Sequence, residues 1–169
     1  MEVAKGKIVI IAHVACNNTK DSQELAAHAQ NLGVDAIDFD VWLSEDKVPV
    51  IIHDGNCKRT CGVDIHVNDM AVAQIKELSA HYAEKFGDQY ACMNVTIPTL
   101  EELLKLREAK RPDLWLGVEI KEYTEETVDI SVELLKKYGI FDRCYFYAFN
   151  ARIIKYIKTK YNGRTMGYP

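Results

Sequence analysis

The chain has 169 residues, of which 48% are hydrophobic and 27% are charged, and its formal net charge at pH 7 is −4. That length provides one domain with a buried core and leaves no room for two domains of ordinary size. The acidic balance argues against a general nucleic-acid-binding protein, and no apolar run approaches the roughly 20 residues that span a bilayer. The first residues show no signal-peptide pattern, so we expect a cytoplasmic protein, or a secreted one if a leader has been removed.

The first half of the chain predicts three strands and one helix. We expect strands near 8–13, 36–43 and 48–53, and a helix near 21–32 that ends at Gly33. The helix carries apolar residues at helical spacing, and the strands are short apolar runs. Residues 44–47 form a short turn between the second and third strands. From 54 to 98 the pattern is polar and irregular, apart from a short helix near 71–80, and we interpret this stretch as an insertion on the side where the strands end.

The second half alternates helix and strand more clearly. Thr99 suits the N-cap of a helix, and strands at 114–120, 144–149 and 165–168 alternate with helices at 125–138 and 151–160. Such alternation predicts a parallel sheet, either open and doubly wound or closed into a (β/α)₈ barrel. The chain has no glycine-rich phosphate loop, and candidate site residues follow several different strands. Both observations favour the barrel.

Five polar side chains stand at the ends of these apolar runs. They are His13, Asp38, Asp40, His53 and Glu119. Asp38 and Asp40 are two residues apart in a strand, so they point to the same side and can share one ion. Burying carboxylates among hydrophobic neighbours is costly, and a divalent cation offsets that cost. The pattern therefore predicts a metal-dependent hydrolase with two imidazoles beside the metal.

The five cysteines make an odd number, which fits reduced thiols better than a complete disulfide framework. Cys57 and Cys61 flank a three-residue loop just after His53. That loop could be closed by a disulfide in an oxidising compartment, and two free thiols are the alternative. We expect no zinc site there, because no second close pair of cysteines or histidines completes four ligands.

Six sequence strings, in their order and spacing, resemble the glycerophosphodiester phosphodiesterase family over nearly the whole chain. They are Ile11–His13, Gly33–Val41, Val48–Asp54, Ile97–Glu102, Val118–Lys121 and Ala148–Asn150. The resemblance implies a single barrel domain over residues 1–169, with the insertion at about 54–98. It also implies a bound Mg²⁺ or Ca²⁺ and hydrolysis of a small-molecule phosphodiester to a phosphomonoester and an alcohol.

Carried over residue by residue, the resemblance gives each site residue a role. Asp38, Asp40 and Glu119 would hold the metal, His13 and His53 would act as general base and general acid, and Lys121 would face the phosphate. The chemistry agrees, because a divalent ion neutralises phosphate oxygens while imidazoles transfer protons near neutral pH.

The chain also departs from the family pattern. Val14 stands where the family has a phosphate-binding arginine, Lys20-Asp21 stands where a Glu-Asn pair is expected, and Asp38 stands where glutamate is usual. Lys20 or Arg59 are candidates to replace the missing arginine. The loop that holds Cys57 and Cys61 resembles, in its placement, that of the spider-toxin phospholipases D. A phospholipase D-like enzyme acting on lysophospholipids or sphingolipids is therefore an alternative, as is a non-catalytic metal-binding remnant.

A (β/α)₈ barrel takes roughly 250 residues, and this chain ends where the sixth strand would finish. We therefore expect a barrel that is truncated after about the sixth strand. A missing C-terminal segment or a second copy in a homo-oligomer would then cover the exposed strand edges.

Overall fold

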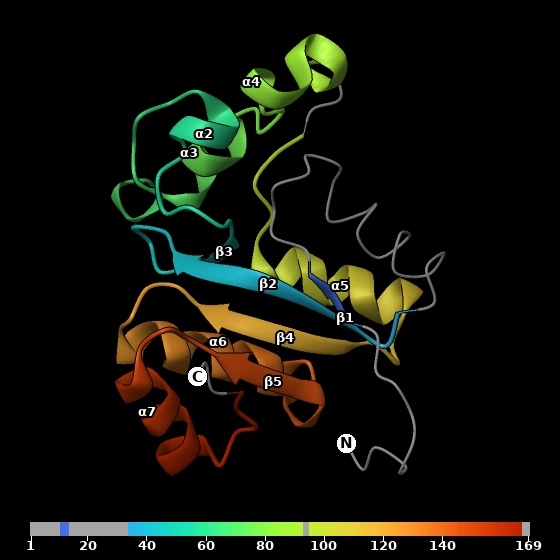
Figure 1. The fold of residues 1–169 in the computed structure, drawn as a ribbon, viewed down its shortest axis with the longest axis vertical. Helices are drawn as coiled ribbons and strands as arrows, with labels where there is room; N and C mark the ends of the chain where they lie inside the picture. Colours follow the sequence, from blue (N-terminus) through green and yellow to red (C-terminus); the bar gives the residue numbers. More distant parts are fainter. Residues whose placement is uncertain (1–10, 14–33, 93–94, 167–169) are drawn as a thin grey trace.

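The computed structural model describes residues 11–13, 34–92 and 95–166 as a sheet with helices packed on it (Figure 1). The strands are β1 (Ile11–His13), β2 (Ala36–Leu43), β3 (Pro49–Ile51), β4 (Trp115–Ile120) and β5 (Cys144–Tyr147). The long helices are α5 (Leu100–Lys110), α6 (Glu125–Lys137) and α7 (Ala151–Tyr161), and a 3₁₀ turn, η3 (Phe141–Arg143), precedes β5. The helix expected near 21–32 lies outside the described residues.

The sheet has the order β1-β2-β4-β5, and β3 lies beside β2. Both β1 and β3 use the same edge of β2: His13 is paired with Asp38 near its start, and Ile51 is paired with Val41 near its end. β1, β2, β4 and β5 are parallel, as predicted, but β3 is antiparallel to β2. The reason is the short 44–47 turn, because a parallel neighbour needs a crossover of a dozen residues or more.

The outer edge of β5 meets the chain again near its end. The Phe146 N–H donates to the carbonyl of Arg164 at 2.8 Å, and the Met166 N–H donates to the carbonyl of Phe146 at 2.8 Å. These bonds make a parallel bridge between Phe146 and Thr165, at the start of the strand predicted for 165–168. Within the described residues β1 and β5 are not paired with each other, so closure into a barrel stays a prediction.

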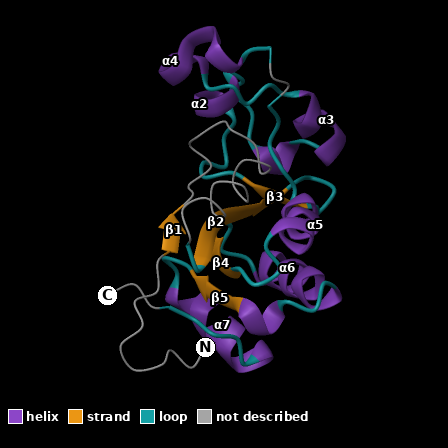
Figure 2. Cartoon of the chain, turned by 90° about the vertical axis from the view of Figure 1, so that its right-hand side faces the viewer, coloured by secondary structure: helices purple, strands orange, loops and turns teal. Residues whose placement is uncertain are grey.

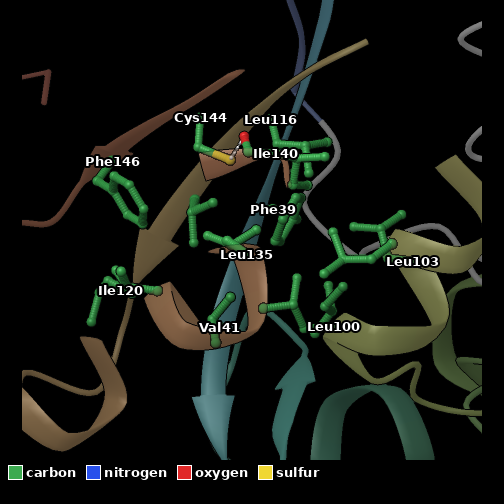
Figure 3. Close-up of a cluster of buried hydrophobic side chains, with 14 of the residues drawn as sticks. Phe39, Val41, Leu100, Leu103, Leu116, Ile120, Leu135, Ile140, Cys144 and Phe146 are labelled. Carbon is green, nitrogen blue, oxygen red and sulfur yellow. Dashed lines mark hydrogen bonds between the residues drawn. The ribbon is translucent and has the colours of Figure 1, made fainter. Parts of the chain in front are cut away.

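Helices α5, α6 and α7 cover one face of the sheet (Figure 2). Alternate strand residues point to this face, and Phe39, Leu116 and Phe146 are buried there in one cluster with Leu103 and Leu135 of the helices (Figure 3). Each fully buried large apolar side chain contributes about 1.5–3 kcal/mol. The main hydrophobic core thus lies on one side of the sheet, and the side chains between these apolar positions point to the other.

The caps of the helices follow the sequence. Thr99 and Glu102 form a capping box at the start of α5, as the predicted N-cap at Thr99 requires. The Thr124 side chain accepts a hydrogen bond from Thr127 N at the start of α6, and the Asn150 side chain accepts one from Arg152 N at the start of α7. Gly139 has a φ of 66°, a left-handed conformation that glycine adopts without strain, and it ends α6 as predicted.

The predicted insertion forms a second small core. It holds α2 (Lys58–Cys61), η1 (Val67–Asp69), α3 (Val72–Glu77), α4 (Ala83–Phe86) and η2 (Gly87–Tyr90). The helices α2, α3 and α4 gather at the end of the molecule next to β3 (Figure 1). Their buried side chains, among them Cys57, Val67 and Ile75, pack with Val50 and Ile52. No helix in the described part of the chain is long and apolar enough to cross a membrane.

Candidate active site

The face of the sheet opposite the three long helices is polar. Asp38 is paired with Gly117, and Asp40 with Glu119, across β2 and β4. Gly117 and Glu119 are in turn paired with Tyr145 and Tyr147 of β5. Because alternate strand residues share a face, these six residues lie on one side of the sheet. The strand register thereby sets all three acids that the sequence predicts as metal ligands on one face of the sheet.

Asp40 and Glu119 form the buried centre of this face, with exposed fractions of 1% and 2%. The Lys121 Nζ atom lies 2.7 Å from Glu119 Oε1 and 3.3 Å from Asp40 Oδ1. Glu119 Oε1 and both carboxylate oxygens of Asp40 nevertheless accept no well-directed hydrogen bond from the described residues. Two buried carboxylates therefore share one ammonium group, which is too little positive charge to neutralise both.

The electrostatics reflect this shortage of positive charge. Burial, followed by the contact with Glu119, raises the pKa of Asp40 to about 6, although Lys121 acts in the opposite direction. Burial also works to lower the pKa of Lys121, but Glu119 and Asp40 outweigh it and raise that pKa above its ordinary value. The centre is thus acidic and short of cations.

Asp38 lies two residues before Asp40 on the same face and is only half-buried. The Tyr147 hydroxyl donates a hydrogen bond to Asp38 Oδ2 at 2.9 Å, and burial together with the Asp38 charge raises the pKa of Tyr147. The ring of Tyr145 is stacked on that of Tyr147, with 6.3 Å between centroids. Tyr147 therefore contacts one of the three predicted metal ligands.

The donor set fits a hard divalent cation in part. Carboxylate oxygens are the preferred ligands of Mg²⁺ and Ca²⁺, and buried acids without hydrogen-bond donors are unfavourable unless a cation neutralises them. Asp40 and Glu119 meet both conditions. Among the described residues, however, no three acidic, histidine or cysteine side chains gather closely enough to count as a ligand group. The role of Asp38 as the third ligand stays a prediction.

His53 lies next to this centre, although not at the end of a parallel strand as expected. The Ile52 N–H donates to the carbonyl of Asp40 at 3.2 Å. This bond sets His53, the next residue, beside the acids. The His53 Nδ1 atom is 2.6 Å from Asp54 Oδ1, and Arg59 forms an ion pair with the other Asp54 oxygen. That ion pair lowers the pKa of Asp54, so the carboxylate is charged and holds His53 Nδ1.

Arg59 was a candidate for replacing the missing arginine of the family, but its ion pair with Asp54 commits it to another role. The second candidate, Lys20, lies outside the described residues. His13 is the register partner of Asp38 in the adjacent strand, which sets its backbone beside the acidic face. Its side chain lies outside what the structure describes, so its catalytic role stays a prediction.

A further acid next to this centre is Glu122, which lies three residues before α6 and is half-buried. It accepts hydrogen bonds from Leu43 N at 3.2 Å, from Asn68 Nδ2 at 2.7 Å and from Thr127 Oγ1 at 3.1 Å. These donors come from the end of β2, from the insertion and from α6, so Glu122 joins three segments next to the acidic centre.

The thiols of Cys57 and Cys61 are both free in this structure, and no disulfide closes the loop after His53.

Comparison with known proteins identifies one family over most of the chain. Residues 17–168 match the model of the glycerophosphoryl diester phosphodiesterase family. The glycerophosphodiester phosphodiesterase of Caldanaerobacter subterraneus subsp. tengcongensis is 32% identical over 90% of this chain and 62% of its own length. A stretch of 37 residues is 78% identical to part of the N-acetylneuraminate lyase of Mediterraneibacter gnavus, but it covers 22% of this chain and 12% of that protein.

The fold agrees with that family. An Oleispira antarctica phosphodiesterase, solved in complex with the product sn-glycerol-3-phosphate, superimposes with a TM-score of 0.75 at 28% identity. The match covers 95% of this chain and 64% of that enzyme. Structures of this family are TIM-barrel-like. The chain therefore spans less than two thirds of the length of these relatives.

Proposed function

Because the chain belongs to the glycerophosphoryl diester phosphodiesterase family, we propose that its polar sheet face catalyses metal-dependent hydrolysis of glycerophosphodiesters to glycerol phosphate and an alcohol. The observation that carries the proposal is the buried pair of Asp40 and Glu119, which lies beside His53 and has only the Lys121 ammonium group to neutralise two carboxylates. A protein that used these residues for stability alone would bury acids with complete hydrogen bonding.

Asp40 and Glu119 would hold Mg²⁺ or Ca²⁺, with Asp38 as the candidate third ligand. A divalent ion at such a site supplies charge that neutralises the non-bridging oxygens of a phosphodiester. Lys121 already lies between the two buried acids, and its ammonium group has three donors. It would orient the phosphate by donating to one of its oxygens.

His53 is the candidate general acid, and the geometry favours that role. The charged Asp54 carboxylate would accept a hydrogen bond from the Nδ1–H group of His53, across the 2.6 Å between Nδ1 and Oδ1. That bond fixes the tautomer and the ring orientation, and it leaves Nε2 for proton transfer to the leaving alkoxide oxygen. Arg59 holds Asp54 from its other side. His13, paired with Asp38 across β1 and β2, would act as the general base that takes a proton from the attacking oxygen.

The second candidate function is a phospholipase D-like activity on lysophospholipids or sphingolipids. One observation favours it: the Phe149 side chain is 64% exposed, and its ring lies 5.7 Å from Lys121 Nζ. An exposed aromatic ring next to the phosphate-facing lysine could contact the apolar part of a lipid substrate.

A panel of phosphodiesters tests both functions. Glycerophosphocholine, glycerophosphoethanolamine and lysophosphatidylcholine would be incubated with Mg²⁺ or Ca²⁺, or with chelator, and the products identified by mass spectrometry. We expect glycerol 3-phosphate from the first two substrates, only with metal. Hydrolysis of the lysophospholipid alone would support the second function. Metal binding without any hydrolysis would instead support a non-catalytic remnant.

Substitutions test the two histidines. His53→Ala and His13→Ala should each lower kcat by at least about 100-fold, the range expected for a general acid or base. His81→Ala is the matched control, since His81 contacts Ser79 within the insertion and has no part in the proposed chemistry. A variant with near-normal turnover would remove that histidine from the mechanism.

A further inference from the structure

Two thiols share the single helical turn of α2, directly after His53 and Asp54. The Cys61 N–H donates to the carbonyl of Cys57 at 2.8 Å, so the two cysteines are joined through the backbone of one turn. Cys57 is completely buried in the insertion core, whereas Cys61 retains some exposure. The proposed hydrolysis uses neither thiol.

The two sulfur atoms have different environments. The hydrogen bond from Cys57, helped by Thr60, outweighs burial and lowers the pKa of Cys61 to about 7. The Thr60 Oγ1 atom lies 3.6 Å from Cys61 Sγ. The contact with Cys61, together with burial, raises the pKa of Cys57. Cys61 is therefore the nucleophile of the pair, and Cys57 stands behind it as a resolving thiol.

The same turn holds Arg59, which contacts His53 through Asp54. Arg59 lies midway between the two cysteines, forms the ion pair with Asp54 and stacks over the Tyr82 ring at 5.3 Å. The Tyr82 N–H donates to the Thr60 carbonyl at 2.9 Å, so Tyr82 is fixed to the turn as well. A change in the shape of α2 therefore reaches His53 through Arg59 and Asp54.

We propose that Cys61 and Cys57 form a reversible thiol-oxidation site that responds to a small disulfide such as glutathione disulfide and controls the support of His53. The Cys61 thiolate attacks one sulfur of glutathione disulfide, forms a mixed disulfide and expels one glutathione thiolate. Cys57 then loses its proton to water, attacks Cys61 Sγ and expels the second glutathione. The pair loses two electrons and two protons, and one glutathione disulfide becomes two glutathione thiols.

Closing this bond must deform α2. Residues four apart on a helical turn have Cβ atoms about 5–6 Å apart, while a disulfide requires about 3.5–4.5 Å. The turn tightens to bridge that gap and moves Arg59, which lies between the two cysteines, away from Asp54. A disulfide that forms against its local geometry is also easily reduced, as a reversible modification requires.

The chemistry of the site is tested without reference to activity. The chain would be equilibrated in glutathione buffers of increasing disulfide fraction, quenched with iodoacetamide and digested. The peptide that contains both cysteines should lose two hydrogens, and dithiothreitol should restore them. Cys61→Ser should abolish the change, whereas Cys92→Ser, at an exposed cysteine outside the turn, should leave it intact. A pair that stays reduced, or modification of Cys92 in preference to Cys61, would overturn the proposal.

The proposed effect of cysteine oxidation on His53 rests on the proposed function, and two measurements test it. Oxidation should lower kcat by about 10-fold with little change in KM, the size expected when a supporting contact is lost. It should also shift the imidazole NMR signals of His53, which reports on the link even in a protein without turnover. Cys61→Ser should show neither effect. An oxidised pair with unchanged His53 signals would refute the link, while an inactive reduced protein with shifted signals would refute only the proposed function.

Discussion

Asp40 of β2 and Glu119 of β4 are register partners in a parallel strand pair, and both contact the ammonium group of Lys121. Two buried acids and one lysine leave one negative charge in excess. The burial of that charge gives the metal-free protein a stability that depends on pH.

Asp40→Asn should therefore change the pH dependence of folding. The pKa of Asp40 rises from 3.8 to about 6 on folding, so the native state binds the proton more tightly. The cost of the buried charge is absent below pH 4 and complete above pH 6, where about two pKa units correspond to about 3 kcal/mol. With chelator present, the unfolding free energy of the variant relative to wild type should rise by about that amount from pH 4 to pH 7, by denaturant titration.

Asp129→Asn is the control for that experiment and should show the opposite trend. Burial acts to raise the pKa of Asp129, but Lys160, Tyr161 and Tyr156 lower it by more. Its contribution to stability is thus present above the unfolded pKa and fades as the pH falls. A difference between Asp40→Asn and wild type that does not vary with pH would contradict the buried-charge account.

Asp54→Asn should lower kcat by about 10- to 100-fold with little effect on KM. The amide cannot hold His53 Nδ1 as a charged carboxylate does, so the imidazole loses its fixed tautomer. Steady-state kinetics would measure the effect. Asp64→Asn is a matched control, because Asp64 is exposed and contacts Lys58 and Asn56 only at the surface. Equal kinetics in the two variants would show that Asp54 does not position His53.

Gly117→Ala should destabilise the protein by about 1–3 kcal/mol, the cost of overpacking. A Cβ atom at position 117 would overlap the Tyr145 ring and its hydroxyl, which lie directly over the glycine on the polar face. Thermal and denaturant unfolding would measure the loss. In a Tyr145→Ala background the same substitution should cost much less. An equal cost in both backgrounds would show that contact with Tyr145 is not the reason why position 117 requires glycine.

Glu122→Ala should cost about 2–3 kcal/mol, because it leaves buried donors of β2, the insertion and α6 without their shared acceptor. Hydrogen exchange should also accelerate in η1, which holds Asn68. The control Glu126→Ala removes only an exposed ion pair with Lys47 and should change stability by less than about 0.5 kcal/mol. Equal effects of the two substitutions would contradict the role of Glu122.

The sequence predicted those features that depend on short-range pattern. The apolar runs located β2, β4 and β5, and the N-cap at Thr99 located the start of α5. The spacing of Asp38 and Asp40 set both acids on one face, which the strand register confirms. The direction of β3 was predicted wrongly, although the short turn before it indicates an antiparallel neighbour.

The rest depends on contacts between distant segments. The contacts of Glu122 could not be predicted, because one of its donors, Leu43 N, is 79 residues away in sequence. The side of the sheet that Tyr145 and Tyr147 face follows from the register of β5 against β4, which a single strand does not reveal. The engagement of Arg59 by Asp54 depends on the conformation of the α2 turn, and its short sequence pattern does not specify that conformation.

Calorimetric titration of the metal-free chain with Mg²⁺ and with Ca²⁺ tests the central claim most directly, namely that Asp40 and Glu119 form a divalent-metal centre. The account predicts one binding site that Asp40→Asn and Glu119→Gln each abolish, and that the exposed control Asp64→Asn leaves intact. No binding to wild type, or unchanged affinity in Asp40→Asn and Glu119→Gln, would contradict it.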